Sequence, residues 1–339
     1  MEFALPHLPP IPRIVDAAGS LTDVPGIRVG HASDWKAATG LTVVLCEKGA
    51  VCGLDVRGGA SGLRNPSVTS PGHRVTLAHA VFFAGGSAFG LDAGAGIMRY
   101  LESRRVGFRV RGQRIPIVTG AILYDLGVGN AGRRPDPPMA YRACRNATRS
   151  PPAEGSVGAG TGATVGKIFG IARGMKGGVG SASLAKGRLR VAALAVVNAF
   201  GDIRDPNTGL LVAGARNDVR GNRLLGTEAW LREGKARGIP RADNTTLAVV
   251  ATNAQLDREQ ASRLAMASHV ALARCVAPAH TLYDGDLVFS LATGGVRADP
   301  LTVETMAVEA LCNAILRGVV LARGVAGVPS WRDLHVSSA

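Results

Sequence analysis

Residues 243–252 read DNTTLAVVAT: a polar, turn-prone segment ends at Asn244, and an apolar, β-branched run follows it. The run predicts a strand that begins at Thr245 and covers residues 246–252. The threonine has a second interpretation if the peptide bond before it is cut. The freed α-amine of Thr245, with a pKa near ~8, would then lie beside its own hydroxyl. That amine can serve as general base for the threonine nucleophile, so no histidine is required.

Short β-branched runs punctuated by glycine predict further strands on both sides of this stretch. They cover residues 41–46, 51–56, 80–84, 191–199 and 287–292. Ser87 is expected to cap a helix that runs to Leu101, and apolar spacing predicts helices over residues 257–276 and from Asp299-Pro300 to Gly324. Strands and helices mix without regular βαβ alternation, which favours a layered α+β fold over a doubly wound parallel sheet. The Arg- and Pro-rich residues 135–152 are expected to form a surface excursion.

Composition predicts a globular protein, because 46% of the 339 residues are hydrophobic and 19% are charged. The formal net charge is +14, and it is unevenly spread. Residues 245–339 hold 7 Arg and 8 Asp+Glu, a net charge of −1, so residues 1–244 carry +15. Such an excess leaves open a basic nucleic-acid-binding protein, but no aromatic residues are interleaved among the arginines. A solvated surface is the preferred interpretation, without nucleic acid as a partner.

The five cysteines show no C-x-x-C spacing, and several of them lie in apolar runs, which indicates buried free thiols in a reducing compartment. The Pro-rich first 20 residues lack the basic region of a secretory signal, and no apolar run has the ~20 residues that span a bilayer. We therefore expect a cytoplasmic protein that is not a membrane protein. The seven histidines show no H-E-x-x-H pattern, so no metal or other cofactor is expected.

Three familiar motifs fail on inspection. The stretch GAGTGA at residues 158–163 follows a polar loop rather than a strand, and the acidic residue of a dinucleotide site is missing. Gly166-Lys167 resembles the end of a P-loop, but Ile168 replaces the Ser/Thr that would bind magnesium. Phe89 takes the place of the second glycine of a G-x-S-x-G elbow, so Ser87 is not a candidate nucleophile.

Several ordered motifs give the chain a resemblance that no single one would carry. They are LTDVPGIRVGH (21–31), GGA (58–60), GGSAFGL (85–91), GTGA (160–163) with Lys167, VNAFG (197–201), NTTLAVVAT (244–252) and DGD (284–286). In this set the chain resembles the N-terminal nucleophile hydrolases of peptidase family S58, which include L-aminopeptidase D-Ala-esterase/amidase, β-peptidyl aminopeptidases and nylon-oligomer hydrolase. The resemblance covers nearly the whole chain.

The resemblance implies a role for each matching residue. Thr245 is the nucleophile, and self-cleavage falls between Asn244 and Thr245. Lys167 corresponds to the lysine beside the nucleophile, where like charge would lower the pKa of the amine. Asn198 corresponds to the asparagine that helps to bind the oxyanion, with a buried core asparagine as the rival interpretation.

The remaining matches are two aspartates and a tyrosine. Asp284 and Asp286 correspond to a pair that orients the amine and the lysine, and period-two spacing would place them on one strand face. A turn-forming Asp-Gly is the rival interpretation. Tyr124 corresponds to a substrate-pocket tyrosine of some relatives, and backbone groups of residues 83–90 are possible further donors.

The fold implied by the resemblance is a four-layer αββα sandwich. Residues 1–20 would be a Pro-rich arm, and residues 21–339 a single domain cut into an α chain (1–244) and a β chain (245–339). The implied activity is hydrolysis of small peptides or amides through an acyl-enzyme on Thr245, in a homo-oligomer of αβ units. An acyltransferase of the ornithine acetyltransferase type is the alternative enzyme, although its cleavage-site sequence matches residues 244–246 poorly.

Overall fold

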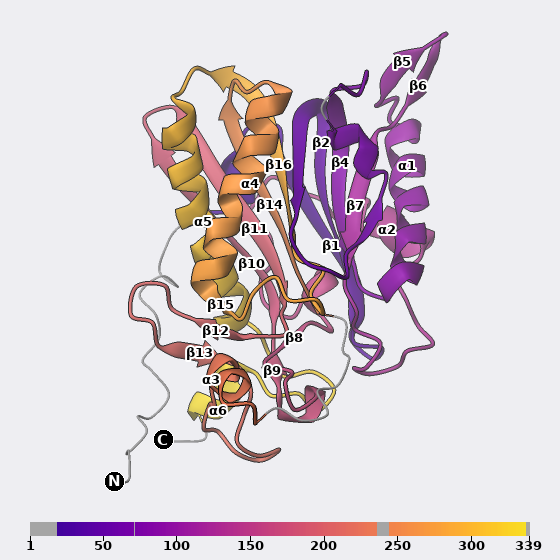
Figure 1. The fold of residues 1–339 in the computed structure, drawn as a ribbon. Coiled ribbons are helices and arrows are strands. Elements are labelled where there is room, and N and C mark those ends of the chain that lie inside the picture. Colours follow the sequence, from indigo (N-terminus) through magenta and orange to yellow (C-terminus); the bar gives the residue numbers. More distant parts are fainter. Residues whose placement is uncertain (1–18, 71, 236–243, 337–339) are drawn as a thin grey trace.

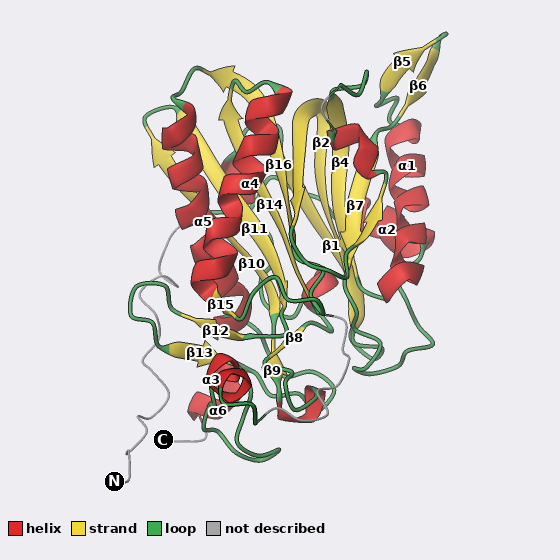
Figure 2. Ribbon diagram, in the orientation of Figure 1, coloured by secondary structure: helices red, strands yellow, loops and turns green. Residues whose placement is uncertain are grey.

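Two layers of β-strands lie face to face, and helices cover the outer side of each layer (Figure 1). The helices α4 (Arg258–Cys275) and α5 (Pro300–Val320) cover one side, and α1 (Gly94–Ser103) and α2 (Pro137–Arg145) cover the other. Figure 2 shows the same order, with helices outside and strands between them. The predicted α+β class and its four-layer αββα arrangement are therefore confirmed.

The computed structural model describes residues 19–70, 72–235 and 244–336. The strands of its main sheet are β1 (Arg28–Asp34), β2 (Thr39–Val56), β3 (Gly62–Arg64), β4 (Leu77–Ala84), β7 (Val118–Ile122), β10 (Gly178–Lys186), β11 (Leu189–Asn198), β14 (Thr245–Ala254) and β16 (Leu287–Val296). Smaller sheets contain β5 (Phe108–Val110), β6 (Gln113–Ile115), β8 (Thr164–Val165), β9 (Met175–Lys176), β12 (Asp202–Arg204), β13 (Leu211–Ala213) and β15 (Val276–Ala277). Two short helices, α3 (Thr227–Arg232) and α6 (Trp331–Val336), complete the description.

One long strand connects the two layers. The main sheet runs in the order β10-β11-β14-β16-β2-β4-β7-β3, and β1 pairs with β2 as well. Residues 51–56 of β2 pair with β16 in one layer, and residues 41–45 pair with β1 and β4 in the other. The two strands predicted over 41–46 and 51–56 are thus one strand. Its pairing is irregular between Leu45 and Ala50, where Gly49 has a φ of 87° that turns the chain without ending the strand.

Alternating side chains divide the interior into three cores. In β14, Leu247 and Val249 face the core between the sheets, while Ala248 and Val250 face the core under α4 and α5. A third core lies between the other sheet layer and helices α1 and α2. Phe83 of β4 and Phe289 of β16 meet inside the inter-sheet core, with ring centroids 6.2 Å apart. Both faces of the central strands are therefore buried, as their apolar runs require.

The two long C-terminal helices begin where their caps predict. Asp257 and Gln260 form a capping box at the start of α4, and the Asp299 carboxylate accepts the Thr302 amide at the start of α5. The cap predicted for Ser87 is wrong: this residue has a φ of 53°, and it begins a 3-10 turn without a side-chain cap.

The surface excursion expected over residues 135–152 is also partly wrong. Asp136 caps α2 there, and α2 buries Met139, Ala140 and Ala143 in the third core. The many arginines and prolines of this stretch suggested a loop. They are compatible with an amphipathic helix, because arginines can occupy its exposed face and prolines its first turn.

The predicted arm, residues 1–20, lies outside the described residues except for its last two. Ser20 is buried there, and the following amide of Leu21 donates to the Ser181 hydroxyl at 2.7 Å. All five cysteines are buried and unpaired, and the cytoplasmic location expected from them stays a prediction. Among the helices of the described ranges, none combines the length and the apolar character needed to cross a membrane.

The contact between Phe83 and Phe289 gives a test of the layered core. Phe289→Ala should lower the free energy of unfolding by about 3–5 kcal/mol, because it leaves a cavity between the sheets. Leu301→Ala is the control, since that side chain is 69% exposed, and its effect should stay within about 0.5 kcal/mol. Urea titration followed by circular dichroism measures both. A loss below about 1 kcal/mol for Phe289→Ala would contradict the packing described here.

Candidate active site at the start of strand β14

The sheet brings three strand ends together at one edge. β14 runs antiparallel to β11 and parallel to β16, so the last residue of β11 meets the first residues of β14 and the residues that precede β16. Asn198 and Thr245 are direct partners in this register. Both are buried, with Thr245 only 3% exposed. The fold therefore places the candidate nucleophile, an amide side chain and the Asp284–Asp286 segment side by side.

The carbonyl group of Asn244 receives two hydrogen bonds. The Thr245 hydroxyl donates to it, and the backbone N–H of Gly285 donates to it at 2.6 Å. The Asn244 amide in turn donates to the Tyr283 carbonyl at 2.9 Å. Residue 244 is therefore held through both its N–H and its carbonyl by residues 283–285, directly before Thr245.

Gly285 is the residue type that this contact requires. A Cβ atom added to Gly285 would lie 2.9 Å from the Thr245 hydroxyl oxygen and 2.9 Å from the Ala60 carbonyl. Both distances are shorter than ordinary van der Waals contacts, so a side chain would displace the hydroxyl. The absence of a Cβ lets the Gly285 amide and the Thr245 hydroxyl reach one carbonyl together.

Lys167 contacts the site through Asn198. The buried Lys167 Nζ donates to the Asn198 carbonyl at 2.9 Å and to its side-chain Oδ1 at 3.0 Å. The same Oδ1 accepts the Thr164 amide at 2.9 Å. The Asn198 side chain is thus fixed by two donors, directly across from Thr245.

Tyr124 reaches this cluster with its backbone. Its carbonyl accepts the Asn198 Nδ2 at 3.2 Å, while its side chain is only partly buried. An amide nitrogen carries two hydrogens, so this bond leaves one N–H of Asn198 for a second acceptor.

Asp284 extends the parallel register of β14 and β16 by one isolated bridge to Asn244, and the placement of both aspartates on one strand face stays a prediction. They precede β16, and their carboxylates bind different neighbours. Asp284 accepts the Phe200 amide at 3.2 Å and the amide and hydroxyl of Thr281 at 3.1 and 2.5 Å. Asp286 accepts the amide of Thr246, the residue after the candidate nucleophile, at 2.6 Å. Each carboxylate therefore binds backbone beside Thr245, at the start of β14 or just after the end of β11.

The GGA motif at residues 58–60 and the preceding Arg57 hold the loop of both aspartates through backbone hydrogen bonds. The Arg57 and Gly58 amides donate to the Asp286 carbonyl at 2.9 and 3.2 Å, and the Ala60 amide donates to the Asp284 carbonyl at 2.9 Å. A Cβ on Gly58 would lie 2.1 Å from the Asp284 carbonyl oxygen. The motif therefore lets two backbones approach closely, which explains its glycines.

Two further buried titratable residues, Lys176 and Asp125, were missed. Lys176 is fully buried, and its Nζ donates to the carbonyls of Thr161 and Ala163 at 2.9 and 2.5 Å. Burial lowers the pKa of Lys176 to about 7, and burial also raises the pKa of nearby Asp125 to about 6. The only signal in the sequence was a lysine set among Met175 and glycines, which does not separate a buried from an exposed lysine.

No group of three or more His, Cys, Asp or Glu side chains that could hold a metal ion occurs within residues 19–70, 72–235 and 244–336. What the cluster offers is a buried hydroxyl at the start of a central strand, with amide donors and a lysine around it. In a four-layer αββα sandwich, this arrangement defines an N-terminal nucleophile hydrolase.

Comparison with known proteins gives the family. The model of the peptidase family S58 matches residues 19–330, so the chain belongs to that family. An uncharacterised aminopeptidase of Mycobacterium tuberculosis is 40% identical, over 93% of this chain and 97% of its own. The 6-aminohexanoate-oligomer endohydrolase of Agromyces sp. is 30% identical, over 89% of this chain and 85% of its own. The protein is accordingly an N-terminal nucleophile amidohydrolase that acts on peptide or amide bonds.

Two solved structures share the fold. The L-aminopeptidase D-Ala-esterase/amidase of Ochrobactrum anthropi has a TM-score of 0.69 at 17% identity, and a β-aminopeptidase of Burkholderia sp. has 0.65 at 22%. Each comparison covers 94% of this chain and 92% of the other. Together with the family, they leave the acyltransferase and nucleic-acid-binding alternatives without support.

The Asp284 environment predicts a pH dependence of stability. Burial, and then the charge of Asp286, raise the pKa of Asp284 to about 6, against ~3.9 in an unfolded chain. The ionised carboxylate therefore destabilises the folded state, so this contribution to stability falls as the pH rises from ~4 toward 6. Asp284→Asn should remove that slope. Urea unfolding at several pH values measures the slope. Asp284→Asn and its parent both carry Thr245→Ala, so that self-cleavage does not affect the comparison.

Asp299 provides a control of opposite sign. Bonds from Thr302 lower the pKa of Asp299, so its stabilisation is present at neutral pH and is lost as the pH falls. Asp299→Asn should change the pH slope in the direction opposite to Asp284→Asn. Superimposable pH profiles for Asp284→Asn and its parent would contradict the interpretation of the buried carboxylate.

Proposed function

We propose that the chain cuts itself between Asn244 and Thr245, and that the exposed Thr245 then hydrolyses small peptides or amides through an acyl-enzyme. The products would be an α chain, residues 1–244, and a β chain, residues 245–339. The observation that carries the proposal is the pair of bonds on the Asn244 carbonyl, from the Thr245 hydroxyl and from the Gly285 amide.

The self-cleavage step follows from these two contacts. The Thr245 oxygen attacks the Asn244 carbonyl carbon, and the Gly285 N–H stabilises the developing oxyanion. Collapse of the intermediate breaks the C–N bond, gives an ester on the threonine oxygen and frees the α-amine of Thr245, whose nitrogen takes up the proton that the hydroxyl loses. Water then hydrolyses the ester, which releases the α-chain carboxylate and leaves a free hydroxyl beside a free amine. The amine is the base that activates the hydroxyl toward the next carbonyl.

Asn198, at the end of the neighbouring strand β11, and Lys167, which is bonded to it, would support that chemistry. Asn198 faces Thr245 in the sheet register, and its remaining N–H suits an oxyanion on the substrate. The Lys167 ammonium on the Asn198 side chain adds positive charge there, which favours a neutral amine on Thr245.

Asp284 and Asp286 would fix the segments on either side of the nucleophile. Asp286 binds the Thr246 amide and Asp284 binds the Phe200 amide, so each carboxylate orients a strand end that borders Thr245. Tyr124 would line the substrate pocket, which is supported by its contact with Asn198.

The substrate class within small peptides and amides is open to a direct test. Relatives are named for 6-aminohexanoate oligomers, β-amino acid peptides and D-Ala esters or amides. A panel of α-, β- and D-amino acid amides with 6-aminohexanoate oligomers, assayed on the processed enzyme, would distinguish them.

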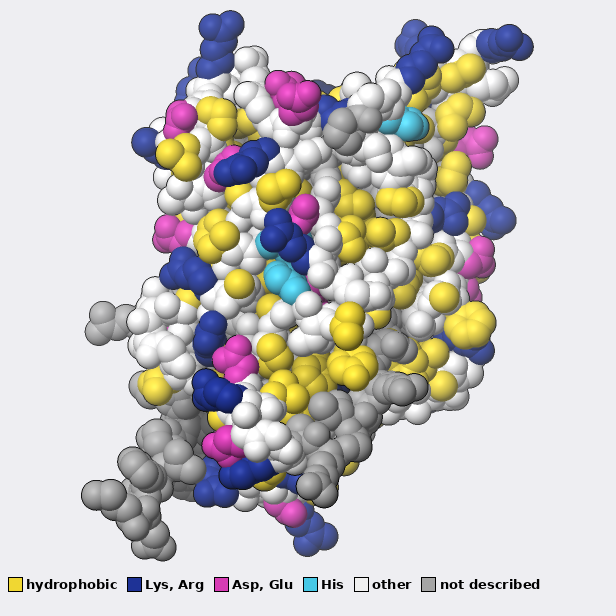
Figure 3. Space-filling view, in the orientation of Figure 1, with side chains coloured by type: hydrophobic (Ala, Val, Ile, Leu, Met, Phe, Trp, Pro, Cys, Tyr) yellow, Lys and Arg dark blue, Asp and Glu magenta, His cyan; other side chains and the backbone are white. Residues whose placement is uncertain are grey.

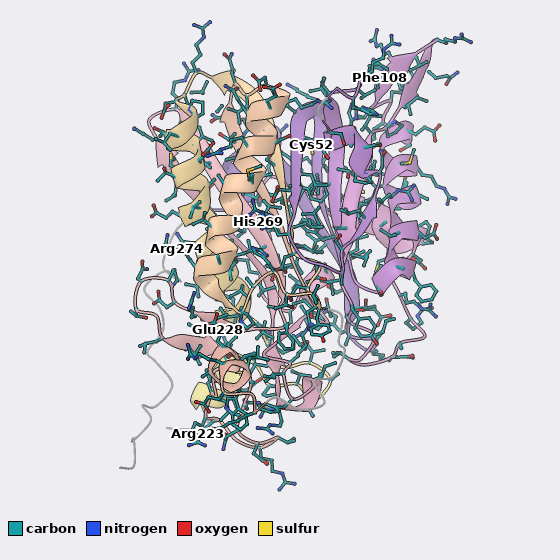
Figure 4. All side chains as sticks on the ribbon, viewed as in Figure 1. Cys52, Phe108, Arg223, Glu228, His269 and Arg274 are labelled. Atoms are coloured by element: carbon teal, nitrogen blue, oxygen red, sulfur yellow. The ribbon has the colours of Figure 1, made fainter. Side chains whose placement is uncertain are left out.

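We also propose a homo-oligomer of αβ units. Strands β5 and β6 form a ribbon that projects beyond α1, with Phe108 near its base (Figures 1 and 4). Phe108, Val110 and Ile115 share one face of it by register, and they are 37%, 43% and 42% exposed. Exposed apolar side chains grouped on one element are typical of protein–protein contacts.

Replacing Thr245 tests the proposed nucleophile. Wild-type protein should separate into two fragments by intact-mass analysis, whereas Thr245→Ala should remain a single chain without amidase activity. Thr245→Ser should still be cut, because it keeps the hydroxyl and the later amine. An active wild-type chain of full length would defeat the proposal.

Asn198→Ala tests the oxyanion role. The kcat of the processed enzyme should fall by about 10²–10³-fold, the effect typical of losing one oxyanion donor. Asn253→Ala is the matched control: this buried amide of the same sheet bonds the Arg190 amide and Arg188 carbonyl at the far end of β14. It should lower stability without lowering kcat. Equal kcat losses in the two variants would show that Asn198 is only structural.

A further inference from the structure

The loop before β16 folds back on one of its own carboxylates. His280 has a φ of 58°, in the left-handed region that few residues other than glycine and asparagine adopt readily. In this conformation both its backbone N–H and its ring Nδ1 reach the Asp286 Oδ2, each at 3.0 Å. An uncommon backbone conformation is thus coupled to two bonds on one oxygen atom.

The other oxygen of Asp286 connects this loop to the nucleophile segment. Oδ1 accepts the Thr246 amide at 2.6 Å, and the carboxylate is completely buried. Donors on both oxygens hold its plane in one orientation. Any rotation of Asp286 would therefore pull on the backbone next to Thr245.

The His280 ring is supported from its other side. His269 of α4 packs against it edge to face, with centroids 4.9 Å apart, and Figure 4 shows His269 on the side of α4 toward the sheet. Burial lowers the pKa of His269 to about 4, so that ring is neutral at physiological pH. His269 Nε2 lies 3.1 Å from the Asp55 carbonyl and 3.3 Å from the Asp55 carboxylate, which also pairs with Arg57 at 2.6 Å. A neutral ring thus fixes the place of His280.

His280 and Asp286 differ in how far solvent reaches them. Histidine side chains gather near the centre of the face in Figure 3, between a Lys/Arg group and a group of hydrophobic side chains. The His280 side chain is 22% exposed, whereas Asp286 beneath it is 1% exposed. His280 therefore separates the buried carboxylate from solvent, as well as donating to it.

We infer that His280 is a positioning residue: through Asp286 it holds the Thr246 amide, and so the direction of the Thr245 hydroxyl and amine. The inference rests on the proposed function of Thr245. No transfer of a proton by His280 is needed, because a fixed Nδ1–H donor is sufficient. Small displacements at a nucleophile reduce rates strongly, by about 10²-fold for 1 Å.

The test uses the full chain, with self-cleavage as the reaction, so no external substrate has to be known. Chains are made by cell-free synthesis, and the first-order rate of conversion to two fragments is followed by mass spectrometry. His280→Gly keeps the backbone N–H, fits the left-handed conformation and removes the ring donor. We expect it to be cut about 10-fold more slowly or worse, with a melting temperature close to that of the wild type.

His280→Asn and His280→Asp form a matched pair for the donor. Both tolerate a left-handed backbone and have the same shape, but only asparagine donates to Asp286. Asparagine should restore cleavage to within about 3-fold of the wild type, and aspartate should be slower than glycine. This pair decides the question even if the glycine variant is unstable. Arg105→Gly, at another left-handed and exposed position, should leave the rate unchanged.

The outcomes separate this inference from the proposal beneath it. Wild-type rates for His280→Gly, or equal rates for the asparagine and aspartate variants, would overturn the role of His280 while Thr245→Ala stays uncut. Cleavage of Thr245→Ala itself would overturn the proposed function. With processed enzyme and alanine 4-nitroanilide, the loss should fall on kcat with KM within about 2-fold. A change in KM alone would contradict a positioning role.

Discussion

The register between β11 and β14 is the constraint on which the candidate site depends. It runs from Val191 opposite Thr252 to Asn198 opposite Thr245. A slip of one residue would turn every side chain of β14 to the other face and exchange Leu247 for Ala248 between the sheets. The same apolar packing that orders the core thus keeps Thr245 opposite Asn198. Core and chemistry are specified together, which suits a site built at a strand end.

The parallel pairing of β14 with β16 explains why the remaining groups come from one loop. Parallel neighbours begin at the same edge, so the residues before β16 must pass the start of β14. Little space is left there: a Cβ on Gly58 or Gly59 would meet the backbone of this loop, and a Cβ on Gly285 would meet the Thr245 hydroxyl. The buried carboxylates of Asp284 and Asp286 accept hydrogen bonds mainly from backbone amides, which fix the loop.

The central strands and the capped helices could be predicted from the sequence, because burial on both faces and Asp caps leave local signals. The single strand β2 could not, since its bend depends on which strands it pairs with in each layer. The candidate site residues were predicted from ordered motifs rather than from periodicity; they are Thr245, Lys167, Asn198 and the two aspartates. His280 carries no such signal: its contact with Asp286 depends on a left-handed backbone that only the folded loop reveals.

Burial of the Asn244–Thr245 bond also bears on how such a chain could be cut. Asn244 is fully buried and Thr245 nearly so, so an external protease has little access to the bond. The Thr245 hydroxyl, in contrast, already contacts the Asn244 carbonyl through a hydrogen bond. In the proposed mechanism, departure of the α-chain end leaves the Gly285 amide without its acceptor. A substrate carbonyl that takes the place of Asn244 would meet the same donor. The Gly285 amide can then bind the carbonyl oxygen both in self-cleavage and in substrate hydrolysis. The Asn244–Thr245 bond of the precursor thus occupies the place that the scissile bond of a substrate takes later.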